Sequence, residues 1–129
     1  MYRILIAVDK SESRARACAK AVADLPGDPD EKQVTIVHSF TDNPRGGSVT
    51  RLESVRTARD YLTERDVPVE IDETSGDPEE ILPKVADEID ADLIVIAGRK
   101  RSPAGKALFG SVTQSLILNS ERPVLVTGD

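Results

Sequence analysis

Short runs of isoleucine, valine and leucine alternate along the chain with longer segments in which apolar residues recur every three or four positions. Such short runs are typical of β-strands, and the longer segments are typical of amphipathic helices. The strands are predicted near residues 3–9, 33–39, 68–74, 93–97 and 123–126. The first, second and fourth runs are almost continuously apolar, as expected of parallel strands covered on both faces. The alternation predicts βαβ units around an open α/β sheet.

A helix is predicted in each gap between the strands. Pro26 and Gly27 end the first helix, and the second spans roughly residues 48–65. Asp77 is suited to cap the third, with Pro78 at its first position, and the last covers residues 111–119. The predicted inward positions are Cys18, Ala21, Val22 and Leu25 in the first helix, Leu52, Val55, Ala58 and Leu62 in the second, Ile81, Leu82, Val85, Ala86 and Ile89 in the third, and Val112, Ser115, Leu116 and Leu118 in the last.

Length and charge narrow the class of protein. A chain of 129 residues is the usual size of one domain, so residues 1–129 are predicted to form a single unit. The formal net charge of -6 repels polyanions and argues against general nucleic-acid binding. The single cysteine, Cys18, cannot form an internal disulfide, no apolar run has membrane length, and no cleavable signal pattern precedes the first strand. We therefore expect a cytoplasmic protein without a membrane segment.

The segment from Gly98 to Ser111 combines glycines, hydroxyls and cations, and it joins the fourth strand to the last helix. Backbone N–H groups approach an anion closely where glycine removes the side chain, and the first turn of a helix presents unpaired donors. Open α/β sheets bind ligands at the carboxyl ends of their strands, so Asp9 and Gly98 are expected to meet at one crevice. The sequence therefore predicts a nucleotide-binding loop.

Two residues of this crevice allow a second interpretation. Asp9 can accept a hydrogen bond from a ribose hydroxyl or help to hold a metal ion, but it can also cap the following helix, as can Ser11. Ser111 can donate to a phosphate or simply cap the last helix, in which case the neighbouring cations form a solvated loop.

Common phosphate-binding and catalytic patterns do not fit the chain. Ala107 stands where a Walker A motif needs a hydroxyl, and neither a G-x-G-x-x-G motif nor the carboxylate cluster of a receiver domain follows the strands. The only histidine, His38, has no obvious nucleophile beside it and is assigned to the core, as is Cys18. The acidic residues from Asp28 to Glu31 are typical of a surface turn. No catalytic residue and no metal ligand is therefore assigned.

Several motifs occur in a fixed order along nearly the whole chain. They are residues 4–11 (ILIAVDKS), Val37-His38, Gly76-Asp77-Pro78, residues 91–95 (ADLIV), Gly110-Ser111-Val112-Thr113 and residues 122–126 (RPVLV). With these motifs the chain resembles the universal stress protein family. The resemblance implies a Rossmann-like open sheet of five parallel strands in the order 3-2-1-4-5, with helices on both faces, as in adenine nucleotide alpha hydrolase-like folds. It also implies a homodimer joined through the C-terminal strand, which runs from Pro123 to Val126.

One branch of that family binds ATP through a glycine signature, in which a glycine, two residues, a second glycine and nine residues precede a glycine and a hydroxyl residue. Gly98 matches the first glycine, and Gly110 with Ser111 matches the closing pair. Arg101 replaces the middle glycine, and the span to Gly110 is one residue short. Arg101 can hinder close backbone approach to the phosphates while it offers a guanidinium group in exchange. The resemblance thus implies ATP, with or without Mg²⁺, and leaves AMP or another adenine nucleotide open.

The resemblance also assigns roles to single residues. Ala7, Val8 and Asp9 line the adenosine end, Ser39 packs the base, Ala97 and Gly98 form the floor, Gly110, Ser111, Val112 and Thr113 meet the phosphates, and Arg99 or Arg101 offsets their charge. The favoured function is a cytoplasmic, regulatory homodimer that binds ATP, with at most slow hydrolysis because no general base is evident. The alternative is a dimeric interaction or adaptor protein whose altered loop binds a partner or a smaller anion. The downstream protein partner is not identified.

Overall fold

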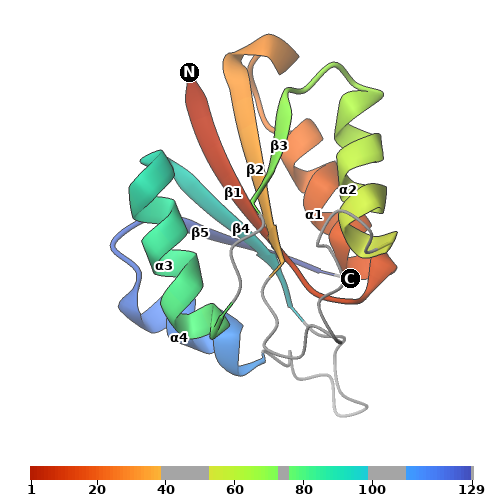
Figure 1. Cartoon of the computed structure of the whole chain (residues 1–129). Helices are drawn as coiled ribbons and strands as arrows, with labels where there is room; N and C mark the ends of the chain where they lie inside the picture. Colours follow the sequence, from red (N-terminus) through yellow and green to blue (C-terminus); the bar gives the residue numbers. More distant parts are fainter. Residues whose placement is uncertain (39–52, 73–75, 99–109, 129) are drawn as a thin grey trace.

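A computed structural model describes residues 1–38, 53–72, 76–98 and 110–128 of the chain (Figure 1). In these residues five parallel strands form one sheet in the order β3-β2-β1-β4-β5. The strands are β1 (Tyr2–Val8), β2 (Lys32–His38), β3 (Val69–Asp72), β4 (Leu93–Ala97) and β5 (Val124–Thr127). The predicted fold class and strand order are therefore confirmed.

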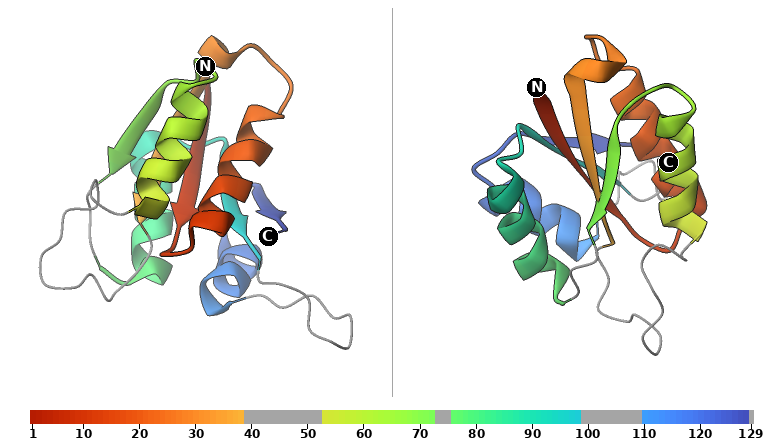
Figure 2. Two further views of the ribbon diagram at one scale, coloured as in Figure 1. Left: turned by 90° about the vertical axis from the view of Figure 1, so that its right-hand side faces the viewer. Right: turned by 45° about the horizontal axis from the view of Figure 1, so that its top comes forward.

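Helices cover both faces of this sheet (Figure 2). Helices α1 (Glu12–Ala23) and α2 (Glu53–Thr63) lie on one face, while α3 (Pro78–Ile89) and α4 (Ser111–Asn119) lie on the other. A short 3-10 helix, η1 (Pro29–Glu31), leads into β2. Every parallel crossover returns the chain to the same end of the sheet, so the carboxyl ends of β1 and β4 come together beside the start of α4.

The central strand β1 explains the continuous apolar runs of the sequence. Its side chains alternate between two buried clusters: Ile4 and Ile6 pack with α1 and α2, whereas Leu5 and Ala7 pack with α3 and α4. Because successive residues point to opposite faces of a strand, both faces must be apolar when helices cover both. Cys18, as predicted, is buried in the first of these clusters.

The element boundaries differ from the predicted ones at several places. β1 and β2 begin one residue earlier than predicted, and β5 begins one residue later, after Pro123. Helix α1 ends at Ala23, so Leu25 lies beyond its C-cap residue. β3 is confined to Val69–Asp72, and the predicted positions 73–75, 39 and 48–52 lie outside the described residues.

The predicted inward face of α4 is wrong in one respect. Leu118 is 79% exposed, whereas Thr113 and Leu116 are the buried residues of this helix. Thr113 and Leu116 are three positions apart and share one face, but Leu118 follows Leu116 by two positions, about 200° around the helix axis. Leu118 and its neighbour Ile117, which is 48% exposed, therefore form an apolar surface on α4.

Candidate functional site

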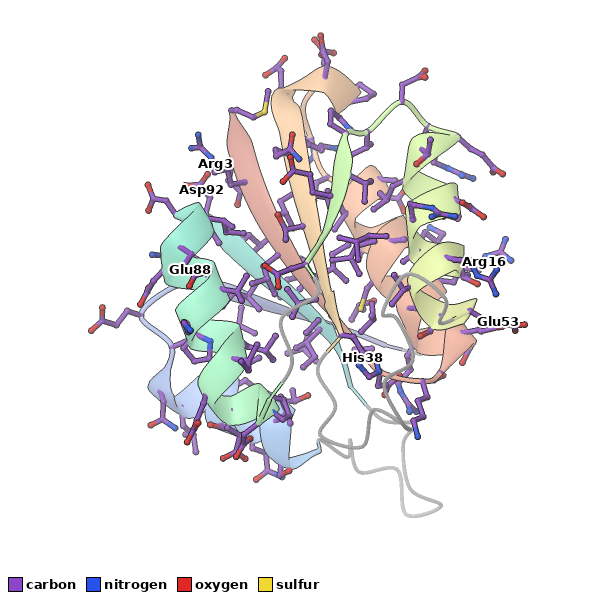
Figure 3. The ribbon with its side chains drawn as sticks, in the orientation of Figure 1. Arg3, Arg16, His38, Glu53, Glu88 and Asp92 are labelled. Carbon is purple, nitrogen blue, oxygen red and sulfur yellow. The ribbon has the colours of Figure 1, made fainter. Side chains whose placement is uncertain are left out.

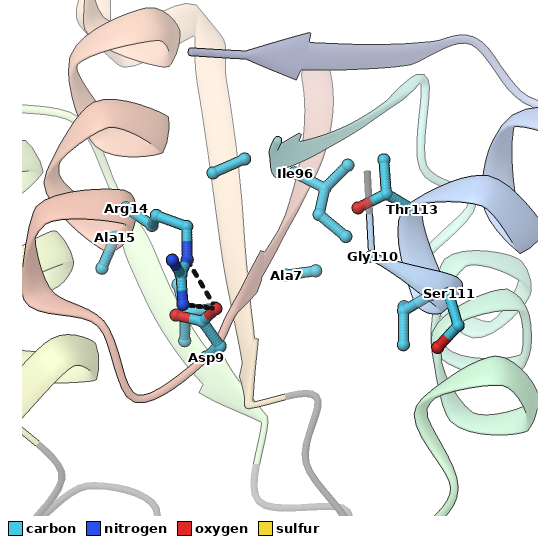
Figure 4. A pocket seen from close by; sticks show the side chains of 11 residues that line it. Ala7, Asp9, Arg14, Ala15, Ile96, Gly110, Ser111 and Thr113 are labelled. Carbon is cyan, nitrogen blue, oxygen red and sulfur yellow. Dashed lines mark hydrogen bonds and ion pairs between the residues drawn. The ribbon is translucent and has the colours of Figure 1, made fainter. Parts of the chain in front are cut away.

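A cavity opens at the carboxyl ends of β1 and β4, between the first turn of α1 and the first turn of α4 (Figure 4). Its volume, including the part open to solvent, is about 630 Å³. The lining residues described by the structure are Ala7, Val8, Asp9, Arg14, Ala15, Ile96, Ala97, Gly110, Ser111, Val112 and Thr113. This is the position at which the strand order reverses, where ligands of open α/β sheets bind.

On the α4 side, the cavity is bordered by the backbone N–H groups at the N-terminus of the helix. Gly110 is the N-cap residue of α4 and makes no side-chain cap hydrogen bond, because it has no side chain to make one. The first intrahelical bond runs from the Gln114 N–H to the Gly110 carbonyl oxygen at 3.0 Å. The N–H groups of the first helical residues precede that bond and carry the positive end of the helix dipole. The alternative interpretation, in which Ser111 only caps the helix, is therefore wrong, since Gly110 is the N-cap residue and Ser111 is the first helical residue.

The α1 side of the cavity has a different construction. Ser11 is the N-cap residue of α1, and its Oγ accepts a hydrogen bond from the Arg14 N–H at 3.2 Å. Asp9 does not cap the helix: its Oδ1 accepts from the Ser11 N–H at 2.8 Å within the preceding turn. Of the two capping assignments that the sequence allowed, the one for Ser11 is confirmed and the one for Asp9 is wrong.

Asp9 is held by an ion pair that the sequence did not reveal. Both Nε and Nη2 of Arg14 lie 2.7 Å from Oδ2 of Asp9 (Figure 4). Both side chains are largely covered, with 26% and 21% of their surface exposed. Five positions separate the two residues, a spacing that belongs to no recognised motif. Only the turn between β1 and α1 brings Arg14 back over the strand end.

The structure brings most of the predicted site residues to this one cavity. Ala7, Val8, Asp9, Ala97, Gly110, Ser111, Val112 and Thr113 all line it. Gly98 is not among the lining residues; its N–H donates to the Thr127 carbonyl oxygen at 2.9 Å and so extends the pairing of β4 with β5. Ser39, Arg99 and Arg101 lie outside the described residues. Arg14, Ala15 and Ile96 line the cavity although the sequence did not single them out.

The charges of the described lining are balanced. Asp9 and Arg14 are its titratable side chains and neutralise each other, while Ser111 and Thr113 contribute hydroxyl groups. The partial positive charge at the start of α4 then gives this end of the cavity a preference for anions. An uncharged wall of alanine, valine and isoleucine side chains joins the two ends.

The remaining residues considered from the sequence lie away from this chemistry or are buried. His38 lies at the carboxyl end of β2 (Figure 3). It is buried, with 5% of its surface exposed. Burial, with a smaller contribution from the charge of Asp9, raises the pKa of the Cys18 thiol to about 12, so it is not a nucleophile at neutral pH. The exposed carboxylates of Asp28, Asp30 and Glu31 gather at η1, at the opposite end of the sheet. Within the described ranges, no helix is long and apolar enough to cross a bilayer.

The fold and the position of the cavity define the class of protein. A parallel sheet ordered 3-2-1-4-5, with a cavity between two strand ends and a helix N-terminus, is a Rossmann-like α/β architecture. The chain belongs to the universal stress protein family, whose model matches residues 1–128.

Individual relatives agree with this assignment. A universal stress protein from Mycolicibacterium smegmatis is 42% identical over 82 residues, which are 63% of this chain and 58% of that protein. The universal stress protein structure from Archaeoglobus fulgidus is 31% identical, with a TM-score of 0.74 and 98% of both chains covered. A second structure from Archaeoglobus fulgidus, in complex with dAMP, is 26% identical, with a TM-score of 0.69 and the same coverage. The chain spans about half the length of the curated relatives it matches.

Proposed function

We propose that this cavity binds an adenine nucleotide, with the phosphate group at the N-terminus of α4 and the nucleoside along the ends of β1 and β4. The observation that carries the proposal is the helix start at Gly110, where no side chain caps α4 and the first-turn donors border the cavity. A helix N-terminus of this kind favours phosphate through both its N–H groups and its dipole.

The relatives support the same ligand class. The structure of the Archaeoglobus fulgidus protein holds dAMP, an adenine nucleotide with a single phosphate. ATP, with or without Mg²⁺, is the ligand we propose for this chain, and AMP is the alternative that the altered loop favours. In either case Ser39 would pack the base, and Arg99 or Arg101 would offset phosphate charge, as the family resemblance implies.

We propose a regulatory role in the cytoplasm rather than catalytic turnover. Asp9 is the carboxylate of the described lining, and its Oδ2 already accepts a hydrogen bond from Arg14 Nε and forms an ion pair with Nη2. A carboxylate neutralised in this way is a poor general base for activating water. Nucleotide binding therefore changes stability and surface, with hydrolysis slow at most.

A homodimer through β5 completes the proposal. β5 is an edge strand, pairs with β4 and is half-buried along its whole length. Beside it, α4 carries the apolar surface of Ile117 and Leu118. Apolar edge strands tend to pair with another chain, and two copies of β5 would continue the sheet across the molecule.

Calorimetric titration with ATP, MgATP, AMP and GTP tests the ligand assignment. We expect the adenine nucleotides to bind and, at a hundredfold excess over the dissociation constant, to stabilise the protein by about 2.7 kcal/mol. GTP is expected to bind more weakly. A chain that binds none of the adenine nucleotides would contradict the proposal and favour the interaction-protein alternative.

Substitution of Ser111 tests the placement of the phosphate. Ser111→Glu adds a carboxylate at the first helical position, where it favours the α4 dipole but repels a bound phosphate. We expect nucleotide affinity to fall by about tenfold or more while the thermal midpoint is unchanged or raised. Ser111→Gln matches the size without the charge and should bind far better than Ser111→Glu. Equal affinities of these two variants would contradict the placement.

A further inference from the structure

The guanidinium of Arg14 is only partly used by Asp9. Its Nε–H donates to Oδ2 at 2.7 Å, and Nη2 forms an ion pair with the same oxygen at 2.7 Å. A guanidinium has five N–H donors, and within the described part of the chain only the Nε–H of Arg14 has a hydrogen-bond acceptor. Arg14 lines the cavity across from the start of α4, with Ala7 between them (Figure 4).

The same contacts fix the carboxylate of Asp9. Oδ2 accepts from Nε of Arg14 and forms an ion pair with Nη2, and Oδ1 accepts from the Ser11 N–H at 2.8 Å. The carboxylate is therefore held from both sides in one orientation, and one lone pair of Oδ1 is left for a ligand hydroxyl. Its negative charge is cancelled within the cavity wall.

Helix stability does not account for an arginine at this position. Arg14 is the third residue of α1, and a cation in the first turn of a helix is opposed by the helix dipole. A partly exposed ion pair contributes little to folding. What Arg14 changes is the charge of the cavity: without it, Asp9 would be an uncancelled anion facing the site of a second anion.

We propose that Arg14 is a positioning residue that makes the cavity selective for phosphorylated adenosine over adenosine itself. It acts by cancelling the charge of Asp9 and fixing its orientation, so that an anionic ligand is not repelled from the strand ends. This inference rests on the proposed function, because the selectivity concerns the same nucleotide site.

Calorimetry with AMP and with adenosine tests this selectivity on four variants: Arg14→Gln, Arg14→Lys, Asp9→Asn and the double variant Asp9→Asn with Arg14→Gln. We expect Arg14→Gln to weaken AMP binding by about tenfold or more, the order expected for an uncancelled unit charge near a phosphate, and adenosine binding by less than about threefold. Arg14→Lys keeps the charge and should retain most of the selectivity. The double variant removes both charges, so it should bind AMP about tenfold or more tightly than Arg14→Gln, which keeps the uncancelled carboxylate of Asp9.

Arg59→Gln is the charge-matched control. Arg59 lies on α2, has a 39% exposed side chain and pairs with Asp60 outside the cavity, so its loss changes the net charge equally without changing the lining. AMP affinity should be unchanged in this variant. Thermal midpoints verify that each protein is folded. If Arg14→Gln does not fold, the test uses the double variant and Arg14→Lys instead. For each of them, the ratio of AMP affinity to adenosine affinity is compared with that of wild type.

Several results would overturn the inference. Equal losses for AMP and adenosine would indicate a structural role only, and a double variant as weak as Arg14→Gln would exclude charge cancellation. If wild type binds AMP and Arg14→Gln binds it equally well, the role of Arg14 is overturned but the proposed function is not. Failure of the wild-type protein to bind any adenine nucleotide overturns both this inference and the proposed function.

Discussion

Lys32 donates from Nζ to the Leu25 carbonyl oxygen at 2.7 Å, although the residue is only 3% exposed. The same ammonium group lies 3.1 Å from the Val22 carbonyl oxygen and 3.5 Å from that of Ala23. These carbonyls lie at and just beyond the C-terminal end of α1, where carbonyl groups lack intrahelical donors and the dipole favours a cation. Lys32 is the first residue of β2, so its hydrogen bonds connect the C-terminal end of α1 to the sheet.

Replacement of Lys32 by methionine should therefore destabilise the protein. The variant keeps the apolar stem but removes the Nζ donor from the Leu25 carbonyl oxygen and its two neighbours, so we expect the free energy of unfolding to fall by about 1–2 kcal/mol in urea titrations. Lys20→Met is the control, because Lys20 is exposed and pairs with Asp24 at the surface. Its effect should stay within about 0.5 kcal/mol. Equal effects of the two substitutions would contradict the role of Lys32.

The contrast between β1 and Lys32 shows what the sequence can predict. In a sheet covered on both faces, every central residue of β1 is buried whichever way it points, so an apolar run alone identifies the strand. Lys32 follows the acidic turn that contains Asp30 and Glu31, and such composition is typical of an exposed segment. Its burial depends on carbonyl groups of a helix end, and residue type does not encode that proximity.

The candidate site shows the same division. Gly110 and Ser111 were predictable because glycine followed by a hydroxyl residue at a strand-to-helix junction is a local signal. Arg14 was missed because its contact with Asp9 requires the turn between β1 and α1 to fold back, and several local conformations allow that pair of residues. Leu118 was misassigned because an apolar residue at the end of a short helix can face either the sheet or solvent.

Glu12 and Glu53 are expected to make stability depend on pH. A hydrogen bond that protonated Glu12 donates to the Glu53 carboxylate, together with the negative charge of Glu53, raises the pKa of Glu12 above 4.5, while Arg56 lowers it. Because the folded protein binds this proton more tightly than the unfolded chain does, the stabilisation is present below pH 4.5 and is lost as the pH rises through the raised pKa. Glu12→Gln should therefore gain in melting temperature relative to wild type between pH 4 and pH 7. A difference that stays constant with pH would contradict this coupling.

Pro83 lies inside α3, where it has no N–H to donate to the carbonyl oxygen of Glu79. The residue is exposed, so little packing is lost when it is replaced. We expect Pro83→Ala to raise the free energy of unfolding by about 1–2 kcal/mol, less than the full helix-interior penalty because proline also restricts the unfolded chain. Pro78→Ala is the control, since proline at the first helical position carries no such penalty, and it should not stabilise. Failure of Pro83→Ala to raise the urea midpoint would contradict the expectation.

The hydrogen bonds of β5 suggest how to separate the proposed dimer from the fold. The carbonyl oxygens of Pro123 and Thr127 accept from the N–H groups of Ile94 and Gly98 in and just after β4. Alternate residues of a strand face the same neighbour, so Val124 and Val126 direct their N–H and carbonyl groups to the free edge.

Val126→Pro should therefore weaken dimerisation and leave the pairing with β4 in place. It removes an outward N–H, and proline at such an edge position is compatible with a strand. Analytical ultracentrifugation should find a dimer for wild type and for Val126→Thr, which keeps the N–H and the strand preference of the site. For Val126→Pro we expect association weakened by about tenfold or more, with the circular dichroism of the fold retained. An unchanged dimer in Val126→Pro would exclude pairing through this edge. A wild-type protein that is monomeric at every concentration would exclude the homodimer, and the free edge of β5 would then be exposed to solvent.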